Sequence, residues 1–81
     1  MSDEEIYAGL TDIVRGIFGD DTIVLDARTT AADVKGWDSI NNINIIVAAE
    51  VRFGIRFSGE EIESIANVGD FVHTIRARLA A

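Results

Sequence analysis

Apolar side chains recur at helical spacing along most of this sequence, and each such run starts beside a helix-capping residue. The segment Ser2-Asp3-Glu4-Glu5 has the pattern of a capping box, in which two side chains accept hydrogen bonds from each other's backbone. The apolar stripe that follows comprises Ile6, Leu10, Ile13, Val14, Ile17 and Phe18. With Gly19 as a stop, this pattern predicts a helix from Asp3 to Phe18.

A second and more apolar segment predicts a helix from Ser39 to Phe53, with Gly54 as its stop. On a helical wheel this segment carries two separate apolar stripes. One stripe consists of Ile40, Ile43, Val47 and Val51, and the other consists of Ile45, Ile46, Ala49 and Phe53. A helix that is apolar on two sides is either central or has one face left for another molecule. The periodicity does not say which stripe faces inward.

Two further capped segments complete the predicted fold. The segment Ser58-Gly59-Glu60-Glu61 is a second capping box, and it opens a brief helix that carries Ile62, Ile65 and Ala66. Asn67 then caps a final helix, whose apolar stripe is Phe71, Val72, Ile75 and Leu79. We therefore expect an all-α fold, a small four-helix bundle with three long helices and one short helix, that forms a single domain over residues 1–81.

The stretch from Asp20 to Gly36 shows no sustained period, and we predict a long first loop there. Its apolar run Ile23-Val24-Leu25 is too short for a globular helix, and no second strand signal lies nearby to pair with it. We expect Ile23 or Leu25 to pin the loop to the core and Ala31 to Val34 to form a short helical turn. Four loop acids do not match the spacing of a calcium loop, so we expect them to be solvated and to hold no metal. They are Asp20, Asp21, Asp26 and Asp33.

The charge balance restricts the class of partner. Fourteen acidic against seven basic side chains give a formal net charge of −7, which argues against nucleic acid or an anionic membrane surface. The absence of cysteine excludes a disulfide framework, a zinc knuckle and a protein thiol. No apolar run approaches the length of a membrane-spanning helix, and the acidic start is unlike a signal peptide. The sequence therefore predicts a cytoplasmic protein that meets basic patches on other proteins and does not insert into membranes.

The dipeptide Asp38-Ser39 is the main candidate for a functional site. If Asp38 caps the helix by accepting one of its free N–H groups, Ser39 is the first helical residue and its hydroxyl is open to solvent. The positive end of the helix dipole favours an anionic group attached there, such as a phosphoester. The alternative interpretation is that these two residues only start a helix.

Several segments of the chain, in this order, resemble acyl carrier proteins. The segments are Gly36-Trp37-Asp38-Ser39-Ile40 after the acidic loop, Phe53-Gly54-Ile55, Ser58-Gly59-Glu60-Glu61-Ile62, and Ile65-Ala66-Asn67-Val68-Gly69-Asp70-Phe71. The resemblance implies that Ser39 is esterified to 4′-phosphopantetheine, which a phosphopantetheinyl transferase donates from coenzyme A. It also implies that Asp38 contributes to recognition by that transferase. The thiol of the arm would then hold acyl groups as thioesters, in agreement with the absence of cysteine.

The resemblance further implies a role for each side of the helix from Ser39 to Phe53. Ile46, Ala49 and Phe53 would join the core, and the candidates for lining an acyl cavity are Asn42, Ile46 and Ile62. The outer face, which would dock onto acyl-activating, condensing or acyl-transferring enzymes, consists of Ile40, Asn44, Val47, Glu50 and Val51. Family members usually carry several acids on this face, where this chain has three asparagines (Asn41, Asn42 and Asn44) and a single Glu50. We therefore expect docking to depend more on apolar contacts than on charge, and a dedicated or secondary pathway is a hypothesis.

The predicted function is that of a non-catalytic, monomeric carrier that delivers acyl intermediates in fatty-acid, lipid or polyketide-type biosynthesis. A carrier for aminoacyl or peptidyl groups, which shares the fold and the arm, is one alternative. The other is an unmodified acidic helical module that binds a partner and gives Ser39 no special role. His73, the only histidine, lacks the companions of a catalytic triad, and we interpret it as structural. We interpret Trp37 as an anchor between loop and core, with a wall beside the phosphopantetheine as the alternative.

Overall fold

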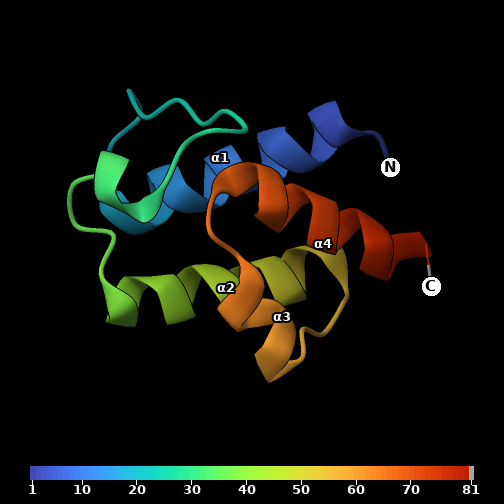
Figure 1. Ribbon diagram of the computed structural model, residues 1–81. Helices are drawn as coiled ribbons and strands as arrows, with labels where there is room; N and C mark the ends of the chain where they lie inside the picture. Colours follow the sequence, from blue (N-terminus) through green and yellow to red (C-terminus); the bar gives the residue numbers. More distant parts are fainter. Residues whose placement is uncertain (81) are drawn as a thin grey trace.

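The computed structural model describes residues 1–80, and within them every regular element is helical. The elements in chain order are α1 (Asp3–Phe18), the 3₁₀ turn η1 (Ala31–Asp33), α2 (Ser39–Phe53), α3 (Gly59–Ser64) and α4 (Val68–Ala80). Figure 1 shows the long helices α1, α2 and α4, the short helix α3 and the long loop between α1 and α2. The predicted all-α fold is confirmed, although η1 ends one residue before the expected end of its turn.

Local capping sets the ends of the first two long helices. The hydroxyl of Ser2 accepts the backbone N–H of Glu5 at 3.2 Å, and the Glu5 carboxylate accepts the N–H of Ser2 at 3.0 Å. Gly19 and Gly54 follow the last residues of α1 and α2 as C-caps. Their φ values of 62° and 66° lie in the left-handed region that glycine adopts without steric cost. The predicted bounds of α1 and α2 are confirmed.

The short helix α3 ends earlier than its sequence pattern indicates. Ser58 and Glu61 form the predicted capping box, but Ile65 and Ala66 lie beyond the end of α3 at Ser64. The assignment of Ile65 and Ala66 to this helix was therefore wrong. Ile65 has an extended backbone, with φ −77° and ψ 106°, because the chain must turn here to enter α4.

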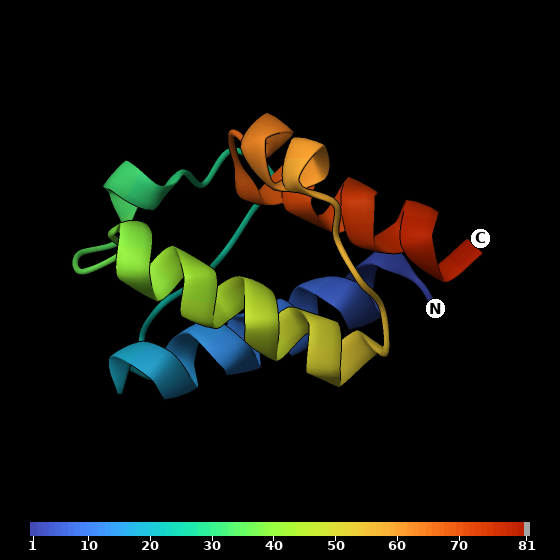
Figure 2. The ribbon, with the colours of Figure 1, turned by 90° about the horizontal axis from the view of Figure 1, so that it is seen from below.

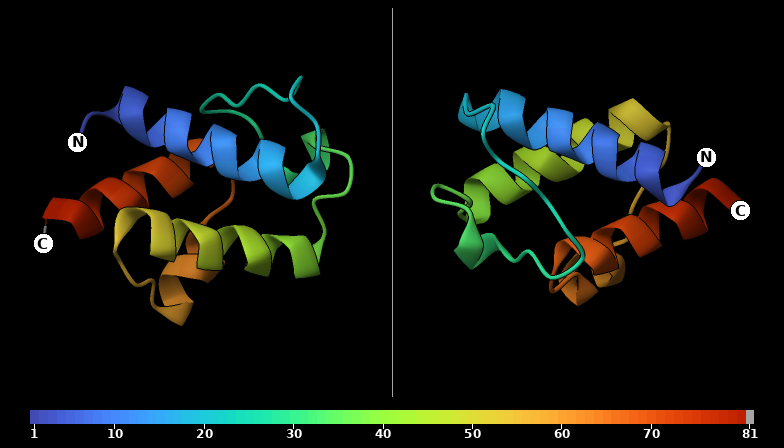
Figure 3. Two further views of the ribbon diagram at one scale, coloured as in Figure 1. Left: turned by 180° about the vertical axis from the view of Figure 1, so that it is seen from behind. Right: turned by 90° about the horizontal axis from the view of Figure 1, so that it is seen from above.

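The helix α1 runs antiparallel to α2 and packs against both α2 and α4 (Figures 1 and 3). Packing decides which stripe of α2 is buried: the inner stripe is Ile45, Ile46, Ala49 and Phe53. Gly9 permits the close approach of α1 to α2, since a Cβ at this position would lie 2.8 Å from Cζ of Phe53. The other buried apolar residues are Ile6, Leu10, Val14, Leu25, Val34, Val68, Phe71, Val72 and Ile75.

The long loop crosses the bundle to the start of α4 before it returns to the start of α2 (Figures 1 and 3). Leu25 is buried in the core, as the pinning role predicted for it requires. The carbonyl oxygens of Ala27 and Thr29 accept the backbone N–H groups of Gly69 and Val68 at 3.1 Å and 2.8 Å. These N–H groups belong to the first turn of α4, so the loop supplies acceptors that the helix itself lacks.

Glu61 connects α3 to α4. Its carboxylate accepts the N–H of Ser58 at 2.8 Å and the Nε–H of Arg78 at 2.9 Å and 3.0 Å. The hydrogen bonds from Arg78, followed by the one from the Ser58 backbone, lower the pKa of Glu61 from 4.5 to about 2. The contact between the two helices therefore depends on an ionised carboxylate.

We predict that Gly69→Ala destabilises the protein by about 1–3 kcal/mol, because overpacking a close contact carries that cost. A Cβ at position 69 would lie 2.8 Å from the carbonyl oxygen of Ala27, and that oxygen belongs to backbone. The measurement is the free energy of unfolding in urea. Gly16→Ala is the matched control: a Cβ there meets nothing within 4 Å, so a gain of up to about 1 kcal/mol is expected. Equal effects of the two substitutions would contradict the close contact.

We predict that the contribution of Glu61 to stability depends on pH between about 4.5 and about 2. The folded pKa lies below the ordinary value, so the contribution is complete above pH 4.5 and is lost as the pH falls to about 2. Urea denaturation of wild type and Glu61→Gln, measured from neutral pH downward, should give stability differences that shrink over this range. Glu63→Gln on the same helix controls for the loss of one negative charge. A stability difference between wild type and Glu61→Gln that stays constant over this pH range would contradict the role of the ionised Glu61 carboxylate.

Candidate functional site

Ser39 is the first residue of α2 and is exposed to solvent. Asp38 is the N-cap, with φ −102° and ψ −174°, and its Oδ1 accepts the backbone N–H of Asn41 at 2.8 Å. The carbonyl oxygen of Asp38 accepts the N–H of Asn42 at 2.8 Å, which closes the first turn. Both residues therefore lie where the sequence pattern placed them, with the hydroxyl-bearing residue at the positive end of the helix.

A set of polar contacts, which the sequence pattern did not reveal, holds the segment before α2 against its first turn. The side-chain amide of Asn41 donates to the carbonyl oxygen of Gly36 at 2.8 Å. The indole N–H of Trp37 donates to Oδ1 of Asn42 at 2.9 Å. Two of the asparagines that stand where acids were expected thus fasten the loop to the helix. The partners are five residues apart in both contacts, Gly36 with Asn41 and Trp37 with Asn42. This spacing was the only feature of the sequence that could have indicated these contacts.

Trp37 is half-buried and reaches both regions that its two interpretations named. Its ring lies 6.4 Å from that of Phe18, at a tilt of 43°, and it packs against the core. It also lines an open depression of about 340 Å³ beside the candidate serine, together with Ala31, Asp38, Ser39 and Asn42. The anchoring of Trp37 to the core is confirmed, and a wall beside the phosphopantetheine stays a prediction.

The depression offers a suitable setting for a phosphoester on Ser39. The first-turn N–H groups of a helix have no acceptor within the helix, so they favour an anion at this end. The site lies at the end of the bundle opposite to the N-terminus and to the end of α4 (Figures 1 and 2). The surface around Ser39 is therefore clear of both of these chain segments.

The outer stripe of α2 is exposed along its length. The exposed fractions of Ile40, Ile43, Val47 and Val51 are 73%, 61%, 51% and 80%, and Asn44 is exposed between them. The inward and outward assignment of the two stripes is therefore confirmed.

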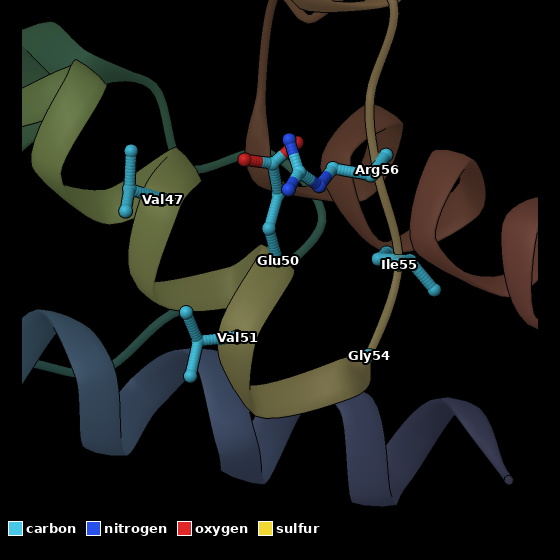
Figure 4. A pocket seen from close by; sticks show the side chains of 6 residues that line it. All are labelled: Val47, Glu50, Val51, Gly54, Ile55 and Arg56. Carbon is cyan, nitrogen blue, oxygen red and sulfur yellow. The ribbon is translucent and has the colours of Figure 1, made fainter.

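A shallow groove of about 590 Å³ runs along the second half of this outer face. Figure 4 shows the residues that line it, which are Val47, Glu50, Val51, Gly54, Ile55 and Arg56. The carboxylate of Glu50 accepts the backbone N–H of Phe57 at 2.9 Å, and in Figure 4 the side chains of Glu50 and Arg56 extend toward one another. The single acid of the outer face is thus engaged within the protein, and the groove is lined by both apolar and charged side chains.

A small, partly open pocket of about 30 Å³ lies beside Trp37. It is lined by Thr29, Ala31, Trp37, Asn42, Ile65, Asn67, Val68 and Phe71. Of the three candidates for an acyl cavity, only Asn42 lines this space. Ile46 is buried in the core, and Ile62 is partly buried against it.

The other candidate residues have local roles. Asp20, Asp26 and Asp33 each accept hydrogen bonds inside their own turn, from Thr22, Arg28 and Thr30 respectively. Within residues 1–80, no three histidine or acidic side chains gather in a way that could hold a metal ion. His73 is exposed on α4, where its Nδ1 lies 3.3 Å from the guanidinium of Arg76. None of the helices in the described part of the chain has the length and apolarity needed to cross a membrane.

Comparison with known proteins agrees with this geometry. Residues 8–75 match the family model described as the phosphopantetheine attachment site. The acyl carrier protein of Renibacterium salmoninarum is 37% identical over 79 residues, 98% of each chain, and that of Acidothermus cellulolyticus is 33% identical over 93% of this chain and 89% of its own. The solution structure of the holo acyl carrier protein from Geobacter metallireducens superposes with a TM-score of 0.86, with 40% identity over 91% of this chain and 85% of that chain. The chain therefore belongs to the acyl carrier protein family.

Proposed function

We propose that Ser39 is the attachment point of 4′-phosphopantetheine and that a phosphopantetheinyl transferase installs the group from coenzyme A. Membership of the family gives the chain an acyl carrier role and phosphopantetheine as its prosthetic group. The observation that carries the assignment to Ser39 is its exposed position at the capped start of α2, inside the matched region.

The residues around Ser39 fit such a group. Asp38 uses its side chain to cap the helix, and this leaves the N–H groups of Ser39 and Ile40 without an acceptor within the helix. These groups would face the phosphate oxygens. The surface depression beside Ser39 is open to solvent, and we propose that the start of the arm occupies it. We propose in addition that the transferase recognises Asp38.

The arm and the polypeptide have different chemical roles in this proposal, because the chain lacks a thiol of its own. It has no cysteine, so the thiol at the end of the arm supplies the sulfur on which cargo is held as a thioester. The polypeptide then serves to present the arm and to be recognised, and we propose that it performs no catalysis itself. The single histidine is paired with Arg76 on α4, and a triad would need it to face a nucleophile.

The outer face of α2 is our proposed docking surface for partner enzymes of fatty-acid, lipid or polyketide-type biosynthesis. It comprises Ile40, Asn44, Val47, Glu50 and Val51. The apolar members are largely exposed, whereas the carboxylate of Glu50 is occupied by the N–H of Phe57. Burial of these apolar side chains under a partner would supply more of the binding energy than charge steering. We propose that the carrier acts as a cytoplasmic monomer, with this face free until a partner covers it.

We predict that co-expression with a phosphopantetheinyl transferase adds the mass of one phosphopantetheine group to the wild-type chain and adds none to Ser39→Ala. The reason is that Ser39 carries the accepting hydroxyl at the helix start. Intact-mass spectrometry is the measurement. Ser64→Ala is the control, since Ser64 is also exposed but donates its hydroxyl to the carbonyl oxygen of Glu61 at 2.9 Å. This variant should gain mass like the wild type.

An unchanged mass of the wild-type chain, with a transferase that modifies a second carrier in the same experiment, would contradict the assignment. It would favour an unmodified helical binding module. Modification of Ser39→Ala would instead move the attachment to another serine.

We predict that Val51→Asn lowers kcat/KM of a partner acyl-transferring enzyme by about tenfold, the loss expected when one apolar contact of an interface becomes polar. Val51 is 80% exposed, so the substitution should leave the unfolding midpoint unchanged. Glu50→Gln is the comparison variant, because the amide oxygen can still accept the N–H of Phe57, and it should lower kcat/KM by less than about threefold. A larger loss for Glu50→Gln than for Val51→Asn would mean that charge governs docking.

A further inference from the structure

The start of α2 is held differently from the starts of α1 and α3. In the capping boxes of α1 and α3, the third helical residue is a glutamate whose carboxylate accepts the backbone N–H of the capping serine, at 3.0 Å for Ser2 and 2.8 Å for Ser58. The third residue of α2 is Asn41. Here the N–H of the capping Asp38 donates to the carbonyl oxygen of Gly36 at 2.9 Å. The reciprocal carboxylate of a capping box is therefore absent from the start of α2.

Two donors converge on the carbonyl oxygen of Gly36. One is the backbone N–H of Asp38, and the other is the side-chain amide of Asn41, which donates at 2.8 Å. The φ of Gly36 is 92°, in the left-handed region that glycine adopts without steric cost. Because glycine loses more conformational freedom on ordering than any other residue, this turn depends on contacts that hold it. The side chain of Asn41 provides one of them.

The contacts of Asn41 fix the orientation of its amide. Its Oδ1 accepts the amide of Asn44 at 3.4 Å, so the Nδ2 side faces Gly36. Its backbone N–H donates to Oδ1 of Asp38 at 2.8 Å. Asn41 therefore holds the carboxylate of the capping residue with its backbone and the preceding turn with its side chain. Ser39 lies in the chain between the residues that these contacts join.

We propose that Asn41 is a positioning residue for the transfer of phosphopantetheine to Ser39. This inference rests on the proposed attachment at Ser39. The hydrogen bond to Gly36 keeps the turn before the helix against the first turn of α2, so the transferase meets the exposed hydroxyl at a formed helix start. Without this bond, part of the apo chain has a loosened helix start. The transferase then binds only the ordered part, which raises KM for the carrier and leaves kcat unchanged.

The donor function distinguishes asparagine from aspartate at position 41. An ionised carboxylate has nearly the same shape but can only accept hydrogen bonds. Asn41→Asp would therefore set a negative oxygen against the carbonyl oxygen of Gly36. Asn41→Ala removes the donor and adds no charge. Both substitutions should release the turn, and their agreement separates the loss of the donor from the gain of a charge.

The first measurement is amide hydrogen exchange of the apo chain by NMR. In Asn41→Ala the N–H of Asp38 should exchange about fivefold faster than in the wild type, the factor that corresponds to one hydrogen bond of about 1 kcal/mol. This N–H reports the turn directly, because its acceptor is the carbonyl oxygen of Gly36. Circular dichroism at the assay temperature checks that each variant is folded.

The second measurement is the steady-state kinetics of a phosphopantetheinyl transferase with coenzyme A, with the product followed by intact mass. Asn41→Ala and Asn41→Asp should each raise KM for the carrier by about threefold at unchanged kcat, since KM varies inversely with the fraction of the competent state. Asn67→Asp is the matched control. Oδ1 of Asn67 accepts the N–H of Asp70 at 2.8 Å, and a carboxylate retains this contact. This variant should keep the wild-type KM.

Unchanged exchange of the Asp38 N–H in folded Asn41→Ala would overturn the hold of Asn41 on the turn. Faster exchange with an unchanged KM would overturn its role in the transfer, as would opposite effects of Asn41→Ala and Asn41→Asp on KM. These outcomes leave the attachment at Ser39 intact. Failure of the wild-type chain to gain the mass of the arm, with a transferase that modifies a second carrier, would overturn that attachment and this proposal with it.

Discussion

The burial of only one of the two apolar stripes of α2 is the constraint on which the rest of the structure depends. Ile45, Ile46 and Ala49 are buried in the core, and α2 packs against α1. Within residues 1–80 no further helix covers the other side of α2. The outer stripe is therefore exposed, and the orientation that buries the inner stripe also fixes where Ser39 lies. The orientation of α2 about its own axis therefore determines both how the core packs and where Ser39 is exposed.

The long loop between α1 and α2 also contributes to the structure, although it has no regular hydrogen bonding along most of its length. Its carbonyl groups at Ala27 and Thr29 complete the first turn of α4, and its buried Leu25 joins the core. Because the loop is bound to the start of α4, its course to η1 is defined. The chain then continues from η1 through Trp37 and Asp38 to the start of α2. The site is thus held by a segment that is anchored to the first turn of α4.

The asparagines at the start of α2, where acids are usual in the family, affect both the charge of the outer face and the contacts between α2 and the preceding loop. Asn41 and Asn42 contribute no charge to the outer face, and their side chains bind Gly36 and Trp37. Glu50, the one acid on that face, is likewise held by a backbone N–H. A face with these properties suits a partner with an apolar contact surface better than one with a strongly basic patch.

The sequence by itself determined the features that depend on neighbours within a few residues. The bounds of α1 and α2 and the position of Ser39 behind the Asp38 cap follow from capping side chains and glycine stops, whose hydrogen bonds span three or four residues. Tertiary structure alone decided which stripe of α2 is buried and where the loop binds α4. These features join groups whose relative position is set only when the helices pack. The early end of α3 belongs with them, because the turn at Ile65 responds to the course of α4 and not to the local apolar period.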